Sequence, residues 1–137
     1  KSNSFVLAFL LLLTKQLPQD LTNGNNVDVG NALSQYNRKQ YHHIFPRAFL
    51  KRQGLNNDQI NKAVNFCILP ATSNRLISNK APSEYFESII PQANFNVILE
   101  SNLIPNDMII YENDDYNTFY EERSKIVFDK IKQSSGE

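Results

Sequence analysis

The sequence predicts an α+β fold, in which two or three short strands and a helix that holds a polar site pack among other helices. Apolar residues recur at helical spacing in several segments, most clearly near the two ends of the chain. Two short apolar runs near the middle have the aromatic and β-branched composition of strands. Proline, glycine and capping residues separate these segments, so the elements are short and the connections between them are brief.

The chain opens with a strongly apolar run at residues 5–13, which predicts a helix over residues 4–15. The run resembles the core of a signal peptide, but no small-residue cleavage site follows it. It is also shorter than the ~20 residues that a membrane-spanning helix needs. We therefore expect a buried core helix that ends near Pro18. The Asn23-Gly24 pair then predicts a turn or hairpin within residues 21–29.

Proline, glycine and capping residues mark three short helices in the middle of the chain. Pro46 suits the first turn of a helix and Gly54 suits its end. Asn57 or Asp58 can cap a second helix, and Thr72 or Ser73 a third. The expected order is a short helical turn at 31–37, a strand at 41–45, helices at 47–53 and 57–64, a strand at 65–69 and a helix from 72 or 73 to about 79.

Helices are expected through the rest of the chain. Pro82 or Ser83 begins one that reaches Ile90, where Pro91 closes it. Apolar residues at helical spacing predict two more, one around residues 95–103 and a last one that starts at Asp114 or Asp115 and runs to about residue 133. The tyrosines and phenylalanines of these last helices are expected in the core.

The domain organisation follows from length and composition. With 137 residues, 41% of them hydrophobic and 20% charged, the chain forms a single globular domain over residues 1–137. It has an N-terminal helix at about 4–15, a site region at about 35–80 and C-terminal helices at about 82–133. Because the chain opens at Lys1 and its only methionine is Met108, we expect a piece of a longer protein. Cys67, the sole cysteine, is expected in the core; it excludes an internal disulfide and fits a cytoplasmic location.

A net charge of zero conceals a strong asymmetry along the chain. Residues 35–80 contain eight basic residues and one acid, a net charge of +7, whereas residues 81–137 contain four basic residues and eleven acids, a net charge of −7. The basic segment, residues 35–80, is about a third of the chain, and it also contains both histidines. Such a segment favours a polyanionic substrate, although basic segments are often ordinary solvated helix faces.

The polar residues of this basic third form the candidate site. His42 and His43 are adjacent, Asn65 opens the second apolar run, and Asn74 follows nine positions later. Imidazole binds metals or takes a proton near neutral pH, and an asparagine oxygen can complete the shell of a hard metal. Together they could hold one divalent ion beside one general base, as phosphodiester hydrolysis requires.

Each of these residues also has a purely structural interpretation. His42 could lie on the surface and His43 in the core, while Asn65 could be a turn residue and Asn74 a helix cap. In addition, neighbours on an ideal strand face opposite ways, so the two histidines serve one site only if the strand ends or bulges there.

The phrase Tyr-His-His-Ile-Phe-Pro at residues 41–46, the run Asn-Phe-Cys-Ile-Leu at 65–69 and Asn-Arg at 74–75, followed by Asn-Lys at 79–80, resemble an HNH endonuclease of the His-Me finger superfamily. The longer phrases at 41–50 and 78–86 are similar to the C-terminal HNH nuclease domain of GmrSD-type restriction proteins, which carry an N-terminal ParB-like domain. The resemblance is strongest over residues 31–86.

The resemblance implies a ββα-metal (HNH) finger and a role for each residue. It implies that His43 is the general base, that His42 and Asn74 are metal ligands, and that Asn65 braces the loop between the strands. Pro70 and Ser73 stand where relatives carry a cysteine pair, so a structural zinc is not expected. An oxygen donor at Asn74 favours magnesium or manganese over zinc.

The implied function is metal-dependent hydrolysis of DNA phosphodiester bonds, in restriction or defence against foreign DNA. Nearby basic residues would hold the DNA backbone without reading sequence; these are Arg47, Lys51, Arg52, Arg75 and Lys80. The implied partners are DNA and an N-terminal ParB-like domain of the same protein, with no membrane. The alternative is a catalytically inactive module that binds nucleic acid or docks a partner within a larger restriction-type protein.

Overall fold

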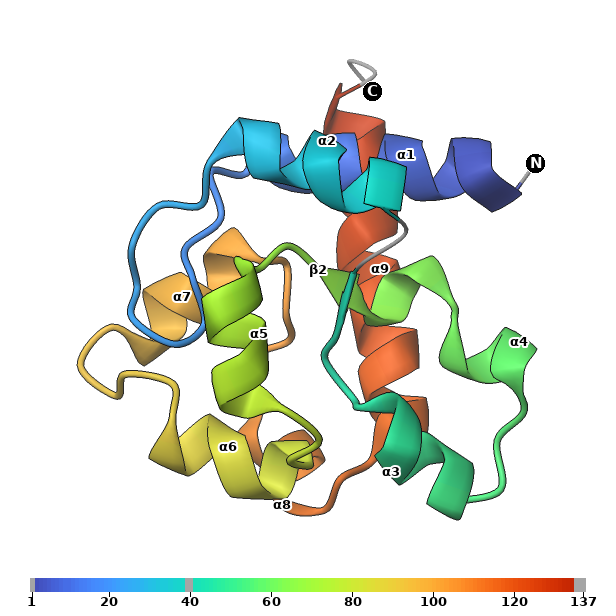
Figure 1. The fold of residues 1–137 in the computed structure, drawn as a ribbon, viewed down its shortest axis with the longest axis vertical. Coiled ribbons are helices and arrows are strands. Elements are labelled where there is room, and N and C mark those ends of the chain that lie inside the picture. Colours follow the sequence, from blue (N-terminus) through green and yellow to red (C-terminus); the bar gives the residue numbers. More distant parts are fainter. Residues whose placement is uncertain (1, 39–40, 135–137) are drawn as a thin grey trace.

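The computed structural model describes residues 2–38 and 41–134, and it confirms a mostly helical α+β fold with one small sheet. Helices surround this sheet, and the long α9 runs behind it (Figure 1). In chain order the elements are α1 (Ser2–Lys15), α2 (Val29–Arg38), β1 (His42–His43), α3 (Arg47–Arg52), α4 (Asn57–Ile60), the 3-10 turn η1 (Ala63–Asn65), β2 (Phe66–Cys67), α5 (Ala71–Ile77), α6 (Pro82–Ser88), α7 (Phe95–Ser101), α8 (Met108–Glu112) and α9 (Tyr116–Ser134).

The predicted N-terminal helix is confirmed as α1, which packs through one face. Phe9, Leu10 and Leu13 are buried against η1, β2 and α9, whereas Phe5 and Leu11 remain exposed. The helical turn expected at residues 31–37 is a longer helix, α2, which lies beside α1 (Figure 1). Within residues 2–38 and 41–134, no helix combines the length and the apolar character needed to cross a membrane.

The turn predicted from Asn23-Gly24 is also confirmed. Gly24 has a φ of +77°, a conformation that glycine adopts without a steric penalty. An isolated antiparallel bridge joins Gln19 to Asn26 across the turn. The turn returns the chain toward α5 and thereby places Asp20 next to the candidate site.

The sheet is shorter than the two predicted strands. β1 pairs antiparallel with β2 through His42 opposite Cys67 and His43 opposite Phe66. The ladder ends because the side chain of Asn65 takes over the pairing: its Oδ1 accepts a hydrogen bond from the backbone N–H of Phe45. Asn65, expected at the start of the strand, therefore ends the turn η1 instead.

β2 and the residues that follow it separate two apolar cores. Phe66 and Ile68 pack with α1 and α9 in the smaller core, whereas Cys67 and Leu69 pack in the larger one beneath α3, α5 and α6. This alternation is the period of two expected of an extended chain. Cys67 is buried, as predicted.

Two predicted helix starts and one predicted helix end differ in the structure. The cap of α4 is Asn56 rather than Asn57 or Asp58, because Asn56 and Gln59 form a reciprocal capping box. Helix α5 begins after Pro70, and not at a cap formed by Thr72 or Ser73. It ends at Ile77, short of the predicted end near residue 79.

The C-terminal helices α6, α7 and α9 are confirmed, but α8 was not predicted. Its five residues follow Asp107, whose side chain accepts a hydrogen bond from the Ile109 backbone. Phe119 lies in the core as expected, whereas Phe128 is 60% exposed, so the prediction that all aromatic residues of the last helix are buried is wrong.

One residue of α9 ties the C-terminal half of the chain to the sheet. Arg123 is fully buried and donates hydrogen bonds to the backbone carbonyls of Val64, Phe66, Asn102 and Leu103. Its guanidinium also lies 5.3 Å from the centre of the Phe9 ring. Burial lowers the Arg123 pKa to about 10, so the side chain stays charged at neutral pH.

Candidate functional site

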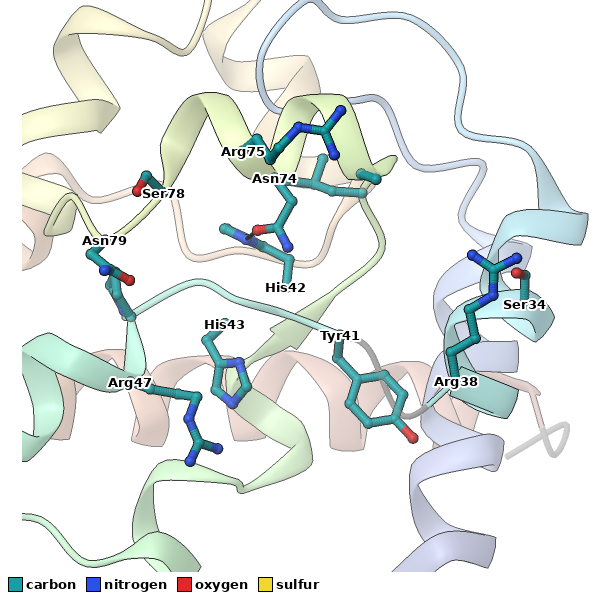
Figure 2. A pocket seen from close by; sticks show the side chains of 13 residues that line it. Ser34, Arg38, Tyr41, His42, His43, Arg47, Asn74, Arg75, Ser78 and Asn79 are labelled. Atoms are coloured by element: carbon teal, nitrogen blue, oxygen red, sulfur yellow. Dashed lines mark hydrogen bonds between the residues drawn. The ribbon is translucent and has the colours of Figure 1, made fainter.

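A cleft of about 760 Å³ lies over β1 and the first turns of α5. Figure 2 shows the two histidines and Asn74 at its centre, with arginines around them. The cleft is lined by Ser34 and Arg38 of α2, Tyr41, His42 and His43 at β1, Pro46 and Arg47 at α3, and Leu69, Ala71, Asn74, Arg75, Ser78 and Asn79 at α5. The cleft therefore brings together three of the four core residues proposed from sequence.

His42 lies at the bottom of the cleft with only 3% of its surface exposed. Its Nδ1 is 2.7 Å from Oδ1 of Asn74, and because an amide oxygen only accepts, the ring donates this hydrogen bond. Burial lowers the His42 pKa to about 4, while the bond to Asn74 and the charge of Asp20 oppose the shift. His42 is therefore neutral at pH 7, as a metal ligand must be.

Asn74 projects into the cleft from the first turns of α5, and its neighbour fixes that helix. Ser73 Oγ donates a 2.6 Å hydrogen bond to the buried carboxylate of Asp20. Asp20 also accepts from the backbone and hydroxyl of Thr22. The turn that precedes α2 is thus bonded to the helix that carries Asn74, across 53 positions of sequence.

The pair formed by His42 and Asn74 has the spacing of two ligands of one small cation. Neighbouring ligands of an octahedral Mg²⁺, each about 2.1 Å from the ion, lie about 3 Å apart. The observed 2.7 Å between Nδ1 and Oδ1 is the length of the hydrogen bond that joins them. A cation held by both atoms would take the place of that hydrogen bond, and the ring proton would then lie on Nε2. Within the part of the chain that the structure describes, no group of three or more His, Cys, Asp or Glu side chains could hold a metal ion. A cation here would have two protein ligands, as magnesium often does.

The second ring nitrogen of His42 differs from the usual arrangement of a metal-bound histidine. His42 Nε2 is buried and has no hydrogen-bond partner among the described residues. In the ring as hydrogen-bonded here Nε2 carries no proton; with a cation on Nδ1 it would carry one, and ligating histidines usually donate that N–H to a carboxylate or a carbonyl. The His42 ring is instead held by its hydrogen bond to Asn74 and by packing against Tyr85. The His42 and Tyr85 rings meet edge to face, with their centres 6.4 Å apart.

His43 faces the other side of β1 from His42, as alternation along a strand requires, yet both line the same cleft. The His43 ring packs edge-on against Phe66, and its Nε2 lies 3.0 Å from Oδ1 of Asn61. Burial lowers its pKa below 6.5, the Asn61 bond opposes this shift, and the charge of Arg47 adds to it. The structural alternative placed His42 on the surface and His43 in the core. The structure shows the opposite, because His42 is buried and His43 is the more accessible of the two.

Asn65 lies beneath the cleft and holds the chain that follows β1. Its Oδ1 accepts from the backbone N–H of Phe45 and its Nδ2 donates to the carbonyl of the same residue. Tyr85 adds a bond from its hydroxyl to the carbonyl of Ile44. Asn65 is completely buried, so its role is to hold the backbone after β1 in place, and it lies out of reach of a ligand in the cleft.

The basic residues predicted to contact DNA fall into two groups. Arg47 and Arg75 line the cleft, on opposite sides of the histidines. Lys51, Arg52 and Lys80 are exposed but do not line it. Arg38 of α2 lines the cleft and was not among the site residues predicted from sequence, while Lys39 lies outside the described residues.

Several residues of the site could not be selected from sequence. Asn61 contacts His43, and Asp20 supports α5, but neither belongs to a local motif. The chain is rich in asparagine, so one more asparagine carries little information. The sequence offered no signal for Asn61, because the pattern predicted one helix over residues 57–64, whereas α4 ends at Ile60.

Comparison with known proteins leaves the family open. No family model matches the chain, and no solved structure matches it. The chain is similar to an uncharacterized protein of Methanocaldococcus jannaschii, with 28% identity over 144 residues that cover 88% of this chain and 24% of the relative. It thus spans about a quarter of the length of that curated relative.

Proposed function

We propose that this chain is a metal-dependent HNH endonuclease that hydrolyses DNA phosphodiester bonds, in restriction or defence against foreign DNA. The observation that carries the proposal is the arrangement in one cleft of a neutral histidine paired with an asparagine oxygen and a second, adjacent histidine. The first pair suits a hard cation and the second histidine suits a general base.

The order of the elements also supports an HNH finger. Two antiparallel strands are followed directly by α5, and the proposed ligands come from β1 and α5. The chain between the strands is held by Asn65 through both of its amide groups. This matches the brace that the resemblance implies for that position.

In the proposed reaction, His43 removes a proton from a water molecule that attacks the phosphorus in line with the leaving oxygen. Arg47 and Arg75 bind the phosphates on either side of the scissile bond and hold the backbone in place. Asn65 keeps β1 in the conformation that presents His43 to the cleft. A Mg²⁺ or Mn²⁺ ion held by His42 and Asn74 would supply charge stabilisation of the phosphate oxygens.

DNA is the proposed substrate because a cleft with arginines on opposite walls suits a polyanionic strand. We further propose that the domain works within a longer protein that has an N-terminal ParB-like domain, in the cytoplasm. The greater length of the Methanocaldococcus jannaschii relative is compatible with this arrangement.

The first test concerns the metal. Nicking of supercoiled plasmid should stop in EDTA and return with added magnesium or manganese, because the site relies on one cation. Replacing a ligand by His42→Ala or Asn74→Ala should weaken Mn²⁺ binding, measured by electron paramagnetic resonance, by about tenfold or more. Asn79→Ala is the matched control, because Asn79 lines the same cleft away from the pair.

Cleavage that continues undiminished in EDTA would exclude the metal mechanism. A protein that binds DNA but never nicks it with any divalent ion would instead support the inactive binding module. Tight Mn²⁺ binding by both ligand variants would show that the cation lies elsewhere.

The second test separates the two groups of basic residues. The double variant Arg47→Ala, Arg75→Ala should flatten the dependence of DNA affinity on log salt by about two units, one for each lost phosphate contact. The variant Lys51→Ala, Arg52→Ala removes the same charge outside the cleft, and we expect it to change the slope less. Fluorescence anisotropy in EDTA measures binding without cleavage. Equal slopes for the two variants would show that DNA is not confined to the cleft.

A further inference from the structure

A single side chain connects the proposed base to the proposed phosphate-binding arginine. Oδ1 of Asn61 lies 3.0 Å from Nε2 of His43 and 2.9 Å from Nη1 of Arg47. Asn61 follows α4, whereas His43 and Arg47 belong to β1 and α3. The contact therefore joins three elements at the edge of the cleft.

The backbone of Asn61 is fixed independently of its side chain. Its N–H donates to the carbonyl of Asn57, and α4 is closed at its other end by the capping box of Asn56 and Gln59. The Asn61 side chain is exposed, and among the described residues its hydrogen bonds are those to His43 and Arg47. An exposed amide on a fixed backbone is suited to orienting groups in a cleft.

The bridge matters because neither partner is rigid by itself. The Arg47 side chain is exposed and long, and its guanidinium would otherwise sample many rotamers. The His43 ring packs on Phe66 but can still rotate about its bond to the backbone. Because the amide oxygen only accepts, Nε2 of His43 carries the ring proton and Nδ1 is the nitrogen that can act as the base. One shared acceptor fixes the orientation of the His43 ring relative to the guanidinium, and so the position of Nδ1 relative to a bound phosphate.

We propose that Asn61 is a positioning residue of this site: its side-chain oxygen holds His43 and Arg47 in register, so that the phosphate bound by Arg47 is presented to His43. The inference rests on the proposed nuclease function and names a residue that this function did not require. Asn61 acts through its two partners and does not itself transfer a proton.

The test compares two substitutions. Asn61→Ala removes the acceptor, so kcat for plasmid nicking should fall about 10-fold to 100-fold, which is the cost of misplacing reacting groups by about 1 Å. The KM should change less than about threefold, because Arg47 is still present to bind phosphate. Asn61→Asp keeps an acceptor oxygen, so kcat should stay close to wild type, while its added negative charge near the phosphate should raise the KM.

Two measurements separate positioning from folding. Asn57→Ala replaces the same residue type one turn earlier in α4 and should leave kcat unchanged. The midpoint of thermal unfolding of Asn61→Ala should remain within about 3 °C of wild type, as is usual for an exposed side chain.

A wild-type kcat for Asn61→Ala would overturn the inference alone, and so would an Asn61→Asp variant as slow as Asn61→Ala. If Asn61→Ala unfolds, the Asp variant still decides, because only positioning through an acceptor predicts its near-normal kcat. A wild-type protein that shows no metal-dependent cleavage would overturn the proposed function, and this inference with it.

Discussion

His43→Ala should reduce cleavage by about a hundredfold to ten-thousandfold, the usual contribution of a positioned general base. The substitution removes the proton acceptor but leaves the paired atoms of His42 and Asn74 in place. DNA affinity, its salt dependence and Mn²⁺ binding should therefore stay close to wild type. Single-turnover nicking measures the loss, and anisotropy and manganese titration serve as the controls.

The pH dependence of the wild-type rate gives an independent check. Burial is the main cause that lowers the His43 pKa below 6.5, so the ring is neutral at pH 7. The rate should decline on acidification as the ring takes up a proton, and this decline should come at a lower pH than for an imidazole with the ordinary pKa. Added imidazole should partly restore His43→Ala by entering the vacated space.

A His43→Ala protein that cuts DNA at nearly the wild-type rate would exclude His43 as the base. Unfolding of the variant would point to a structural role for the ring, which packs on Phe66. His43→Asn, a polar replacement, then distinguishes the two roles: a folded but inactive protein supports the base.

Arg123→Met should destabilise the folded protein by about 3–5 kcal/mol, a large part of the 5–15 kcal/mol typical of a domain. The guanidinium is fully buried and bonds to four backbone carbonyls, two of them at Val64 and Phe66 on either side of Asn65. Methionine fills much of the volume but donates no hydrogen bond, so these carbonyls would lose their buried partner. Urea unfolding measures the change in free energy.

Lys125→Met is the matched control, since it makes the same type of replacement two residues later in α9. Lys125 is exposed and pairs with the exposed Glu122 at 3.5 Å, so its loss should cost less than about 1 kcal/mol. Arg123→Lys keeps the charge but supplies fewer directed donors, and we expect an intermediate loss. If Arg123→Met were as stable as Lys125→Met, the carbonyl contacts would contribute nothing net.

Local signals predicted most helices. The apolar period predicted α1 and α9, and Pro46 with Gly54 predicted the limits of α3 to within one residue. Gly54 has a φ of +90°, the conformation for which glycine is suited at a helix end. These signals succeed because they depend on residues within one or two turns of each other.

The errors arose where a distant residue changed the local preference. The strand after Tyr41 was expected to reach Phe45, but the Asn65 side chain replaces the ladder there. Ser73 was expected to cap α5, but its hydroxyl bonds to Asp20 instead. In both cases the competing partner is at least 20 positions away, so its approach is decided by packing.

The sequence by itself determined which residue types stand at the candidate site: an adjacent pair of histidines on an apolar strand and two asparagines at fixed spacing after it. Only the tertiary structure decided that Asn74 faces His42, that Asn61 joins His43 to Arg47, and that Arg123 is buried at the sheet. The physical reason is that a side chain's direction follows from its own backbone, whereas its partner depends on how helices far apart in the chain pack on two shared cores.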